Sequence, residues 1–155
     1  MNERPTVGPL ASPGYWLHHA ALAWRRELGA RLRGLNLTPT QFDVLGSLSW
    51  QSRDGEVTQQ MVADFAGIDR MMTSKVVRSL EDRGLLSRAT HVSDARVLVL
   101  TLTDAGRGVV RDATAEARAL DRELFPDTAA SEPLRTSLAS VIADLEHAAS
   151  ASRVP

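Results

Sequence analysis

The fold is decided by residues 58–106, which read TQQMVADFAGIDRMMTSKVVRSLEDRGLLSRATHVSDARVLVLTLTDAG. Thr58 can accept a hydrogen bond from the free amides of a first helical turn, and Gly67 supplies a turn after that short helix. Asp69 is placed to cap a second helix, and Gly84 follows where a left-handed residue is needed to end it. Two helices joined by so short a turn predict a helix-turn-helix.

The second helix of this motif separates an apolar face from a basic one. Spacings of three and four place one set on a single buried stripe, namely Thr73, Val76, Val77 and Leu80. The opposite side carries Arg70, Met71, Ser74, Lys75 and Arg78. Cationic groups on such a face can reach phosphates or guanine edges in a DNA major groove, and a methionine can pack on a thymine methyl. The alternative is a merely solvated face.

A predicted hairpin follows the second helix. Residues 85–88 and 97–102 are apolar and β-branched runs, and residues 89–95 form a polar tip between them. A hairpin in this position is a wing, and Arg96 is placed to enter an adjacent minor groove. We expect Asp94 to orient Arg96 or another local arginine by an ion pair. The alternative is an ordinary exposed hairpin pair that contributes little. Thr58 and Gln59, at the start of the first helix, complete the candidate DNA contacts.

Five short motifs occur in order along the chain: LTPTQFDVL at 37–45, DR at 69–70, LEDRGLL at 80–86, DAR at 94–96 and LTLTDAG at 100–106. Together they resemble the MarR family of bacterial winged helix-turn-helix regulators, over nearly the whole chain. The resemblance implies a mainly α fold with a small β-hairpin wing, joined to a helical dimerisation region. It also implies that Arg96 contacts DNA beside Asp94. One departure is Met71-Met72, which replaces the small hydroxyl residues frequent early in the family's recognition helix.

Composition is consistent with this interpretation. The chain has 155 residues, 43% of them apolar, which is enough for one domain with a core. The sequence has no long uncharged apolar run and no secretory signal, so we expect no membrane association. It has no cysteine, in agreement with a reducing cytoplasm. The formal net charge is −1, yet residues 69–96 carry six basic and four acidic side chains, a local excess of two positive charges.

The segments outside the motif predict a dimerisation apparatus. Apolar periodicity predicts a helix from about residue 15 to 33, and the capping box of Thr38 and Gln41 begins another that runs to about Trp50. After the wing, Thr103 or Asp104 caps a long helix that ends near residue 125. A last helix opens at Ser131 and carries the stripe Leu134, Leu138, Val141, Leu145 and Ala148. Pairing with a second copy would bury such surfaces, and packing within one subunit is the alternative.

The predicted organisation therefore has three parts. Residues 1–14 form a flexible N-terminal arm, residues 15–36 and 104–150 form the helical dimerisation region, and residues 37–103 form the winged helix-turn-helix DNA-binding domain. The four histidines, 18, 19, 91 and 147, lack a metal-ligand spacing, and no phosphate-binding glycine loop, serine elbow or acid pair is present. We therefore expect no metal, no cofactor and no enzymatic activity.

The resemblance implies a small aromatic or anionic effector between the dimerisation helices and the winged domain. The candidate lining residues are Trp16, His18, His19, Trp24, Phe42 and Trp50. The alternative is that these are ordinary core aromatics and satisfied polar groups. The expected function is that of a homodimeric repressor that binds a pseudo-palindromic operator in double-stranded DNA and is released by this ligand. The competing hypothesis is a winged-helix protein-interaction module without specific DNA binding.

Overall fold

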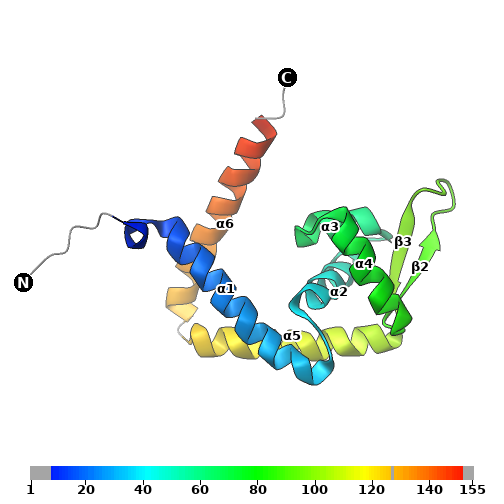
Figure 1. The fold of residues 1–155 in the computed structure, drawn as a ribbon, viewed down its shortest axis with the longest axis horizontal. Coiled ribbons are helices and arrows are strands. Elements are labelled where there is room, and N and C mark those ends of the chain that lie inside the picture. The colour runs from blue at the N-terminus through cyan, green and yellow to red at the C-terminus, as the bar shows by residue number, and fades with distance from the viewer. Residues whose placement is uncertain (1–7, 127, 152–155) are drawn as a thin grey trace, which may run out of the picture. The chain divides into compact units, whose positions relative to one another are not determined.

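Helices form most of the chain, and three strands form one small antiparallel sheet in the part that the structure describes, residues 8–126 and 128–151 (Figure 1). The structure is a computed structural model. In chain order its elements are η1 (Pro9–Ala11), α1 (Pro13–Leu32), η2 (Arg33–Leu35), α2 (Pro39–Gln51), β1 (Val57–Thr58), α3 (Gln59–Ala66), α4 (Arg70–Asp82), β2 (Leu86–Thr90), β3 (Leu98–Leu102), α5 (Asp104–Leu124) and α6 (Thr128–Ala151). The chain divides into two units between Ala117 and Arg118.

Short-range capping sets the helix boundaries of the first unit. The Thr38 hydroxyl accepts from the Gln41 amide, and the Gln41 side chain accepts from the Thr38 amide, so the predicted capping box is present. Thr58 Oγ1 accepts from the Met61 amide at 3.2 Å, and Asp69 Oδ1 accepts from the Met72 amide at 2.9 Å. These bonds satisfy amides that have no partner within the helix, which is why α2, α3 and α4 begin where the sequence predicts.

Two glycines end the helices of the helix-turn-helix. Gly67 and Gly84 have φ values of 63° and 68°, a conformation that strains any residue with a Cβ. The predicted stripe of α4 is buried, with exposures of 0% for Thr73, Val77 and Leu80. The Thr73 hydroxyl also donates to the Asp69 carbonyl at 2.9 Å, which allows this polar side chain to lie in the core. The apolar face of α4 therefore fixes which side of the helix is left for a partner.

The sheet has the strand order β1-β3-β2, with every pairing antiparallel. Val57 pairs with Leu100, and β1 is an edge strand of this sheet. The prediction that residues 89 and 90 belong to the wing tip was wrong, because Ala89 pairs with Val99 and Thr90 with Leu98. Cross-strand pairing overrides the weak strand propensity of Ala89, and β2 starts at Leu86 rather than at residue 85. The tip consequently spans the residues between Thr90 and Leu98.

A close backbone contact ties the wing to the start of α5. An added Cβ on Gly106 would lie 1.8 Å from the Leu85 carbonyl oxygen, so only glycine allows the two segments to approach this closely. Thr103 adds hydrogen bonds to this contact. Its hydroxyl donates to the Gly84 carbonyl at 2.7 Å and accepts from the Gly106 amide at 3.0 Å, while its own amide donates to the Leu85 carbonyl at 3.2 Å. Thr103 is thus the cap of α5 that the sequence offered as one of two candidates.

The N-terminal helix is attached to α2 by a polar contact that the sequence did not predict. Arg25 donates from Nη1 to Asp43 at 2.8 Å and from Nη2 to the Thr40 hydroxyl at 3.0 Å. Helix α1 begins at Pro13, two residues before the prediction, because Ser12 accepts from the Tyr15 amide. Residues 9–11 of the proposed arm form η1, and residues 1–7 lie outside the described residues.

The second unit contains the end of α5 and helix α6. The prediction that α6 opens at Ser131 was wrong, because the helix begins at Thr128 and holds Pro133 inside it. The apolar stripe of α6 is exposed in the single chain, with exposures of 42% for Leu134, 37% for Leu138 and 64% for Leu145. Val141 and Ile142 are exposed as well. None of the described helices is long and apolar enough to cross a membrane.

Candidate nucleic-acid interface

The outer face of α4 is exposed and basic. Arg70, Lys75 and Arg78 are exposed, Ser74 is half-buried, and Met71 retains 85% of its accessible surface. An open hollow of about 580 Å³ follows this face and is lined by Met71, Ser74, Lys75, Arg78, Ser79, Asp82 and Arg83. Four of the five residues that the sequence placed on this face therefore line one hollow, namely Met71, Ser74, Lys75 and Arg78, whereas Arg70 does not line it. Ser79, Asp82 and Arg83 complete its lining.

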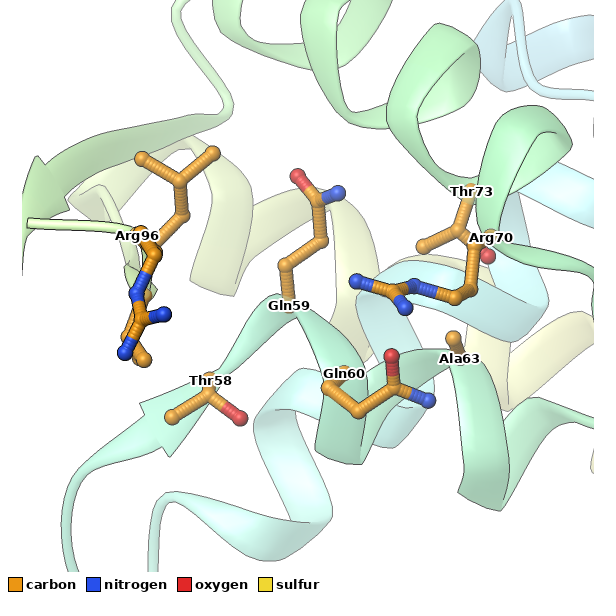
Figure 2. A pocket seen from close by; sticks show the side chains of 9 residues that line it. Thr58, Gln59, Gln60, Ala63, Arg70, Thr73 and Arg96 are labelled. Carbon is orange, nitrogen blue, oxygen red and sulfur yellow. The ribbon is translucent and has the colours of Figure 1, made fainter.

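A second groove of about 640 Å³ lies where α3, α4 and the wing meet. Its lining residues are Thr58, Gln59, Gln60, Ala63, Arg70, Thr73, Arg96, Val97 and Leu98. Figure 2 shows Arg96 and Arg70 on opposite sides of the groove with Gln59 between them. Two guanidinium groups from separate elements thus border one concave surface, an arrangement that favours an anion such as a phosphate. Gln60 was absent from the predicted contacts, and its side chain donates to Asp64 at 2.7 Å.

Gln59 has an unusual environment within this groove. Its Oε1 atom is buried and has no hydrogen-bond partner within the described residues. A buried amide oxygen without a hydrogen-bond partner costs stability. The sequence named Gln59 only from its position at the start of α3, so this buried oxygen could not have been foreseen.

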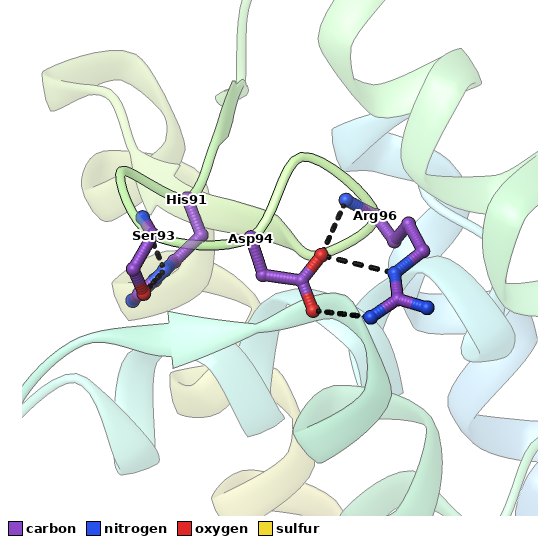
Figure 3. A network of polar contacts seen from close by, with 4 residues as sticks. All are labelled: His91, Ser93, Asp94 and Arg96. Carbon is purple, nitrogen blue, oxygen red and sulfur yellow. Dashed lines mark hydrogen bonds and ion pairs between the residues drawn. The ribbon is translucent and has the colours of Figure 1, made fainter.

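The wing tip holds its arginine by a local network (Figure 3). Asp94 Oδ1 accepts from the Arg96 amide at 2.9 Å and from Arg96 Nε at 3.1 Å, while Oδ2 accepts from Nη2 at 3.3 Å. These bonds from the Arg96 side chain and backbone hold the pKa of Asp94 below its ordinary value. The predicted ion pair is present, and it orients a guanidinium whose side chain is still 90% exposed.

His91, at the same tip, makes polar contacts with Ser93 and Glu56. Its Nδ1 atom accepts from the Ser93 amide at 3.2 Å and lies 3.0 Å from the Ser93 hydroxyl. Its Nε2 atom lies 3.1 Å from a carboxylate oxygen of Glu56, in the loop before β1. This contact joins the wing to the opposite edge of the sheet, and the sequence did not predict it because Glu56 and His91 are far apart in the chain.

Another polar contact links helix α4 to strand β2 of the wing. Glu81, in the last turn of α4, accepts from Arg88 Nε at 2.7 Å and from the Arg88 amide at 3.2 Å. The side-chain hydrogen bond from Arg88 is the main reason that the pKa of Glu81 lies below its ordinary value. Arg88 is therefore engaged within the fold and is mostly covered, whereas Arg70, Arg78 and Arg96 are exposed to a partner.

Comparison with known proteins decides the family. The sequence profile described as the MarR family matches residues 37–98. Over 119 residues the chain is 37% identical to YdcH, an HTH-type transcriptional regulator of Bacillus subtilis (strain 168), covering 76% of this chain and 81% of that protein. The chain belongs to the MarR family. It is therefore a transcriptional regulator with a winged helix-turn-helix, and such regulators are not enzymes.

Other MarR relatives extend this comparison. The HTH-type transcriptional repressor Rv2887 of Mycobacterium tuberculosis (strain ATCC 25618 / H37Rv) is 33% identical over 112 residues, covering 72% of this chain and 78% of that one. CouR from Rhodococcus jostii RHA1, solved bound to p-coumaroyl-CoA, is 25% identical with a TM-score of 0.76 over 87% of this chain and 94% of its own. CouR bound to a 23-mer DNA duplex is 27% identical with a TM-score of 0.76, covering 94% and 99%.

The residues predicted to bind an effector in this MarR protein lie on α1 and α2 and differ in exposure. Trp16, His18 and His19 are exposed on α1, while Trp24 and Phe42 are half-buried. The two grooves described above are lined by none of them.

The close ring neighbours of His19 come from its own helix. The Tyr15 ring, which the sequence reasoning missed, lies with its centroid 4.2 Å from that of His19. The Trp16 indole donates to the Leu10 carbonyl at 2.9 Å. Trp50 is exposed at the end of α2, where the Arg53 guanidinium lies 4.7 Å from its ring. Among the residues that the structure describes, no cluster of three or more His, Asp or Glu side chains could hold a metal ion.

Proposed function

We propose that this MarR regulator is a homodimeric, sequence-specific repressor that a small aromatic or anionic ligand releases from its operator. The observation that carries the proposal is the groove between α3, α4 and the wing, where Arg70 and Arg96 flank Gln59. This groove and the basic face of α4 are both left open by the fold, so a duplex with regularly spaced phosphates matches their charge.

In the proposed complex, α4 lies in a major groove and presents Arg70, Met71, Ser74, Lys75 and Arg78. The wing enters the adjacent minor groove with Arg96, which Asp94 orients. Thr58 and Gln59 lie at the N-terminus of α3, where free amides and the positive end of the helix dipole favour a phosphate. The surface between Arg70 and Arg96 would then face the phosphate backbone that separates these two grooves. The complex of CouR with a 23-mer DNA duplex supports double-stranded DNA as the partner.

The dimer is proposed from the apolar surface of α6. Leu138, Val141 and Leu145 follow a spacing of three and four, yet each is more than a third exposed. A contiguous apolar helix face in water is unfavourable, so a second copy of the same helix is the occupant that the symmetry of a palindromic operator would require. We accordingly assign residues 15–36 and 104–150 to dimerisation and residues 37–103 to DNA binding. Repression itself is proposed by analogy with the repressor Rv2887.

Release by a ligand rests on two observations. CouR is solved with the aromatic acyl thioester p-coumaroyl-CoA, and α1 of this chain carries Tyr15, Trp16 and His19 close together. A ligand lowers operator affinity only through its preference for the DNA-incompetent state, and a hundredfold preference corresponds to about 2.7 kcal/mol. A panel of aromatic acids should quench tryptophan fluorescence and release the operator, and His19→Ala should weaken both effects. A panel that does neither contradicts ligand control.

A mobility-shift assay tests the DNA-binding proposal against the protein-interaction alternative. The probes are the region upstream of the chain's own gene and a scrambled duplex of equal length and composition, at moderate salt. We expect the upstream probe to bind at least about a thousandfold more tightly than the scrambled one. A protein-interaction module with an incidental basic face would retard both probes equally and weakly.

A further inference from the structure

Met71 is the most exposed large apolar side chain of α4. It is 85% exposed, while Met72 beside it is 45% exposed and the apolar stripe of α4 is buried. The Met71 side chain lines the open hollow on α4 together with Ser74, Lys75 and Arg78, which follow it at three, four and seven residues. An unbranched thioether exposed to water beside Lys75 and Arg78 contributes little to the fold, so a role in the partner complex is the better account of its position.

The chemistry of base edges restricts what Met71 can contact. Met71 is the second residue of α4, and the N-terminal residues of a recognition helix are those that reach base edges in the major groove. Met71 has no strong donor or acceptor, so it cannot read the polar pattern of a guanine or an adenine. Of the four bases, only thymine presents a methyl group in the major groove. Lys75 and Arg78, which line the same hollow, are cations that can bind the phosphates around that base.

We propose that Met71 is a specificity-determining residue that recognises a thymine methyl group in each operator half-site. The inference rests on the proposed function, since it requires α4 to enter the major groove. Recognition is by burial of the thioether and its methyl group against the 5-methyl group of the base. Removing one such methyl group from the duplex should therefore weaken binding about fourfold, and removing one in each half-site should weaken it by roughly the square of that factor.

The experiment replaces each thymine of the operator in turn with deoxyuridine, which pairs with adenine as thymine does but lacks the 5-methyl group. Affinities are measured by fluorescence anisotropy for the full-length chain and for Met71→Ala, Met71→Leu and Met72→Ala. For the unaltered chain, one thymine in each half-site should show the fourfold loss. Met71→Ala should bind the thymine and deoxyuridine duplexes equally, whereas Met71→Leu and the matched control Met72→Ala should retain the difference.

Each contrary result has a separate meaning. Specific binding without a cost for any deoxyuridine overturns the thymine contact and leaves the repressor proposal intact. A deoxyuridine cost that persists in Met71→Ala assigns the methyl contact to another residue and overturns the role of Met71. If the unmodified upstream duplex is bound no better than a scrambled one, the proposed function fails and the inference fails with it. Because Met71 lies on the surface, its variants should unfold at the same temperature as the unaltered chain, which is checked by circular dichroism.

Discussion

Replacing Gly106 with alanine tests the contact that ties the wing to α5. The new Cβ would lie 1.8 Å from the Leu85 carbonyl oxygen, 2.9 Å from the Leu85 carbonyl carbon and 3.2 Å from Leu102 Cδ2. Two of these three atoms belong to the backbone, so a change of side-chain rotamer cannot relieve the clash. The segment around Leu85 must move by more than an ångström, or α5 must move away from it.

The expected cost follows from this geometry. Overpacking a close-packed site costs about 1–3 kcal/mol and more when the backbone must shift, so the upper end applies here. The Leu85 carbonyl also accepts from the Thr103 amide, and a stretched bond adds about 0.5–1.5 kcal/mol. The higher helix propensity of alanine offsets this loss by up to about 1 kcal/mol. We therefore expect Gly106→Ala to lower the free energy of unfolding by about 3 kcal/mol, which corresponds to a fall in melting temperature of roughly 6–12 °C.

Gly108 provides a matched control in the same helix. A Cβ at this position meets only Arg111 Nη2, at 3.9 Å, which is an ordinary contact with a flexible side chain. Gly108→Ala should therefore raise the free energy of unfolding by up to about 1 kcal/mol, opposite in sign to the change at Gly106. Urea unfolding monitored by circular dichroism measures both variants. Equal midpoints for Gly106→Ala and the unaltered chain would refute the packing argument.

Three further predictions concern the wing, its link to α4, and the dimer. Arg96→Ala should weaken operator binding by about 1–3 kcal/mol with little change in melting temperature, because its side chain is 90% exposed; unaltered affinity at moderate salt would remove the wing from the interface. Glu81 has a lowered pKa, so its stabilising effect is present above the ordinary carboxyl pKa of about 4.3 and is lost as the pH falls through the lowered value. The stability difference between the chain and Glu81→Gln should thus stay constant from about pH 5 to 8 and shrink below about pH 4; a difference that instead grows in acid would contradict the assignment. Leu138→Asp would place a charge in the proposed α6 interface, so light scattering should report loss of dimer mass together with loss of specific DNA binding. A stable monomer that still binds a full operator tightly would be incompatible with the proposed architecture.

Local signals in the sequence predicted the helix-turn-helix well. Thr58, Asp69 and Gly84 act on neighbouring backbone groups, so their roles depend on sequence spacing alone. The buried stripe of α4 was predicted for the same reason, since helical periodicity is a local property. The Asp94–Arg96 pair also spans only two residues.

Features that depend on tertiary packing could not be predicted. The bonds from Arg88 to Glu81 and the contact between His91 and Glu56 require the register of the hairpin against α4 and β1. The extension of β2 through Ala89 likewise follows from pairing with β3 and not from propensity. The sequence predicted that the last helix opens at Ser131, yet α6 begins at Thr128.

The central claim is that two copies of α4 lie in successive major grooves of one operator, with the wings in the minor grooves outside them. A chemical footprint on the upstream operator tests it most directly, with dimethyl sulfate reporting major-groove guanine N7 atoms and hydroxyl radicals reporting the sugars of the minor groove. The account predicts two major-groove windows of protection about 10 base pairs apart, flanked by minor-groove protection that disappears in Arg96→Ala while the major-groove windows persist. A single window, or protection spread evenly along the duplex, would contradict it.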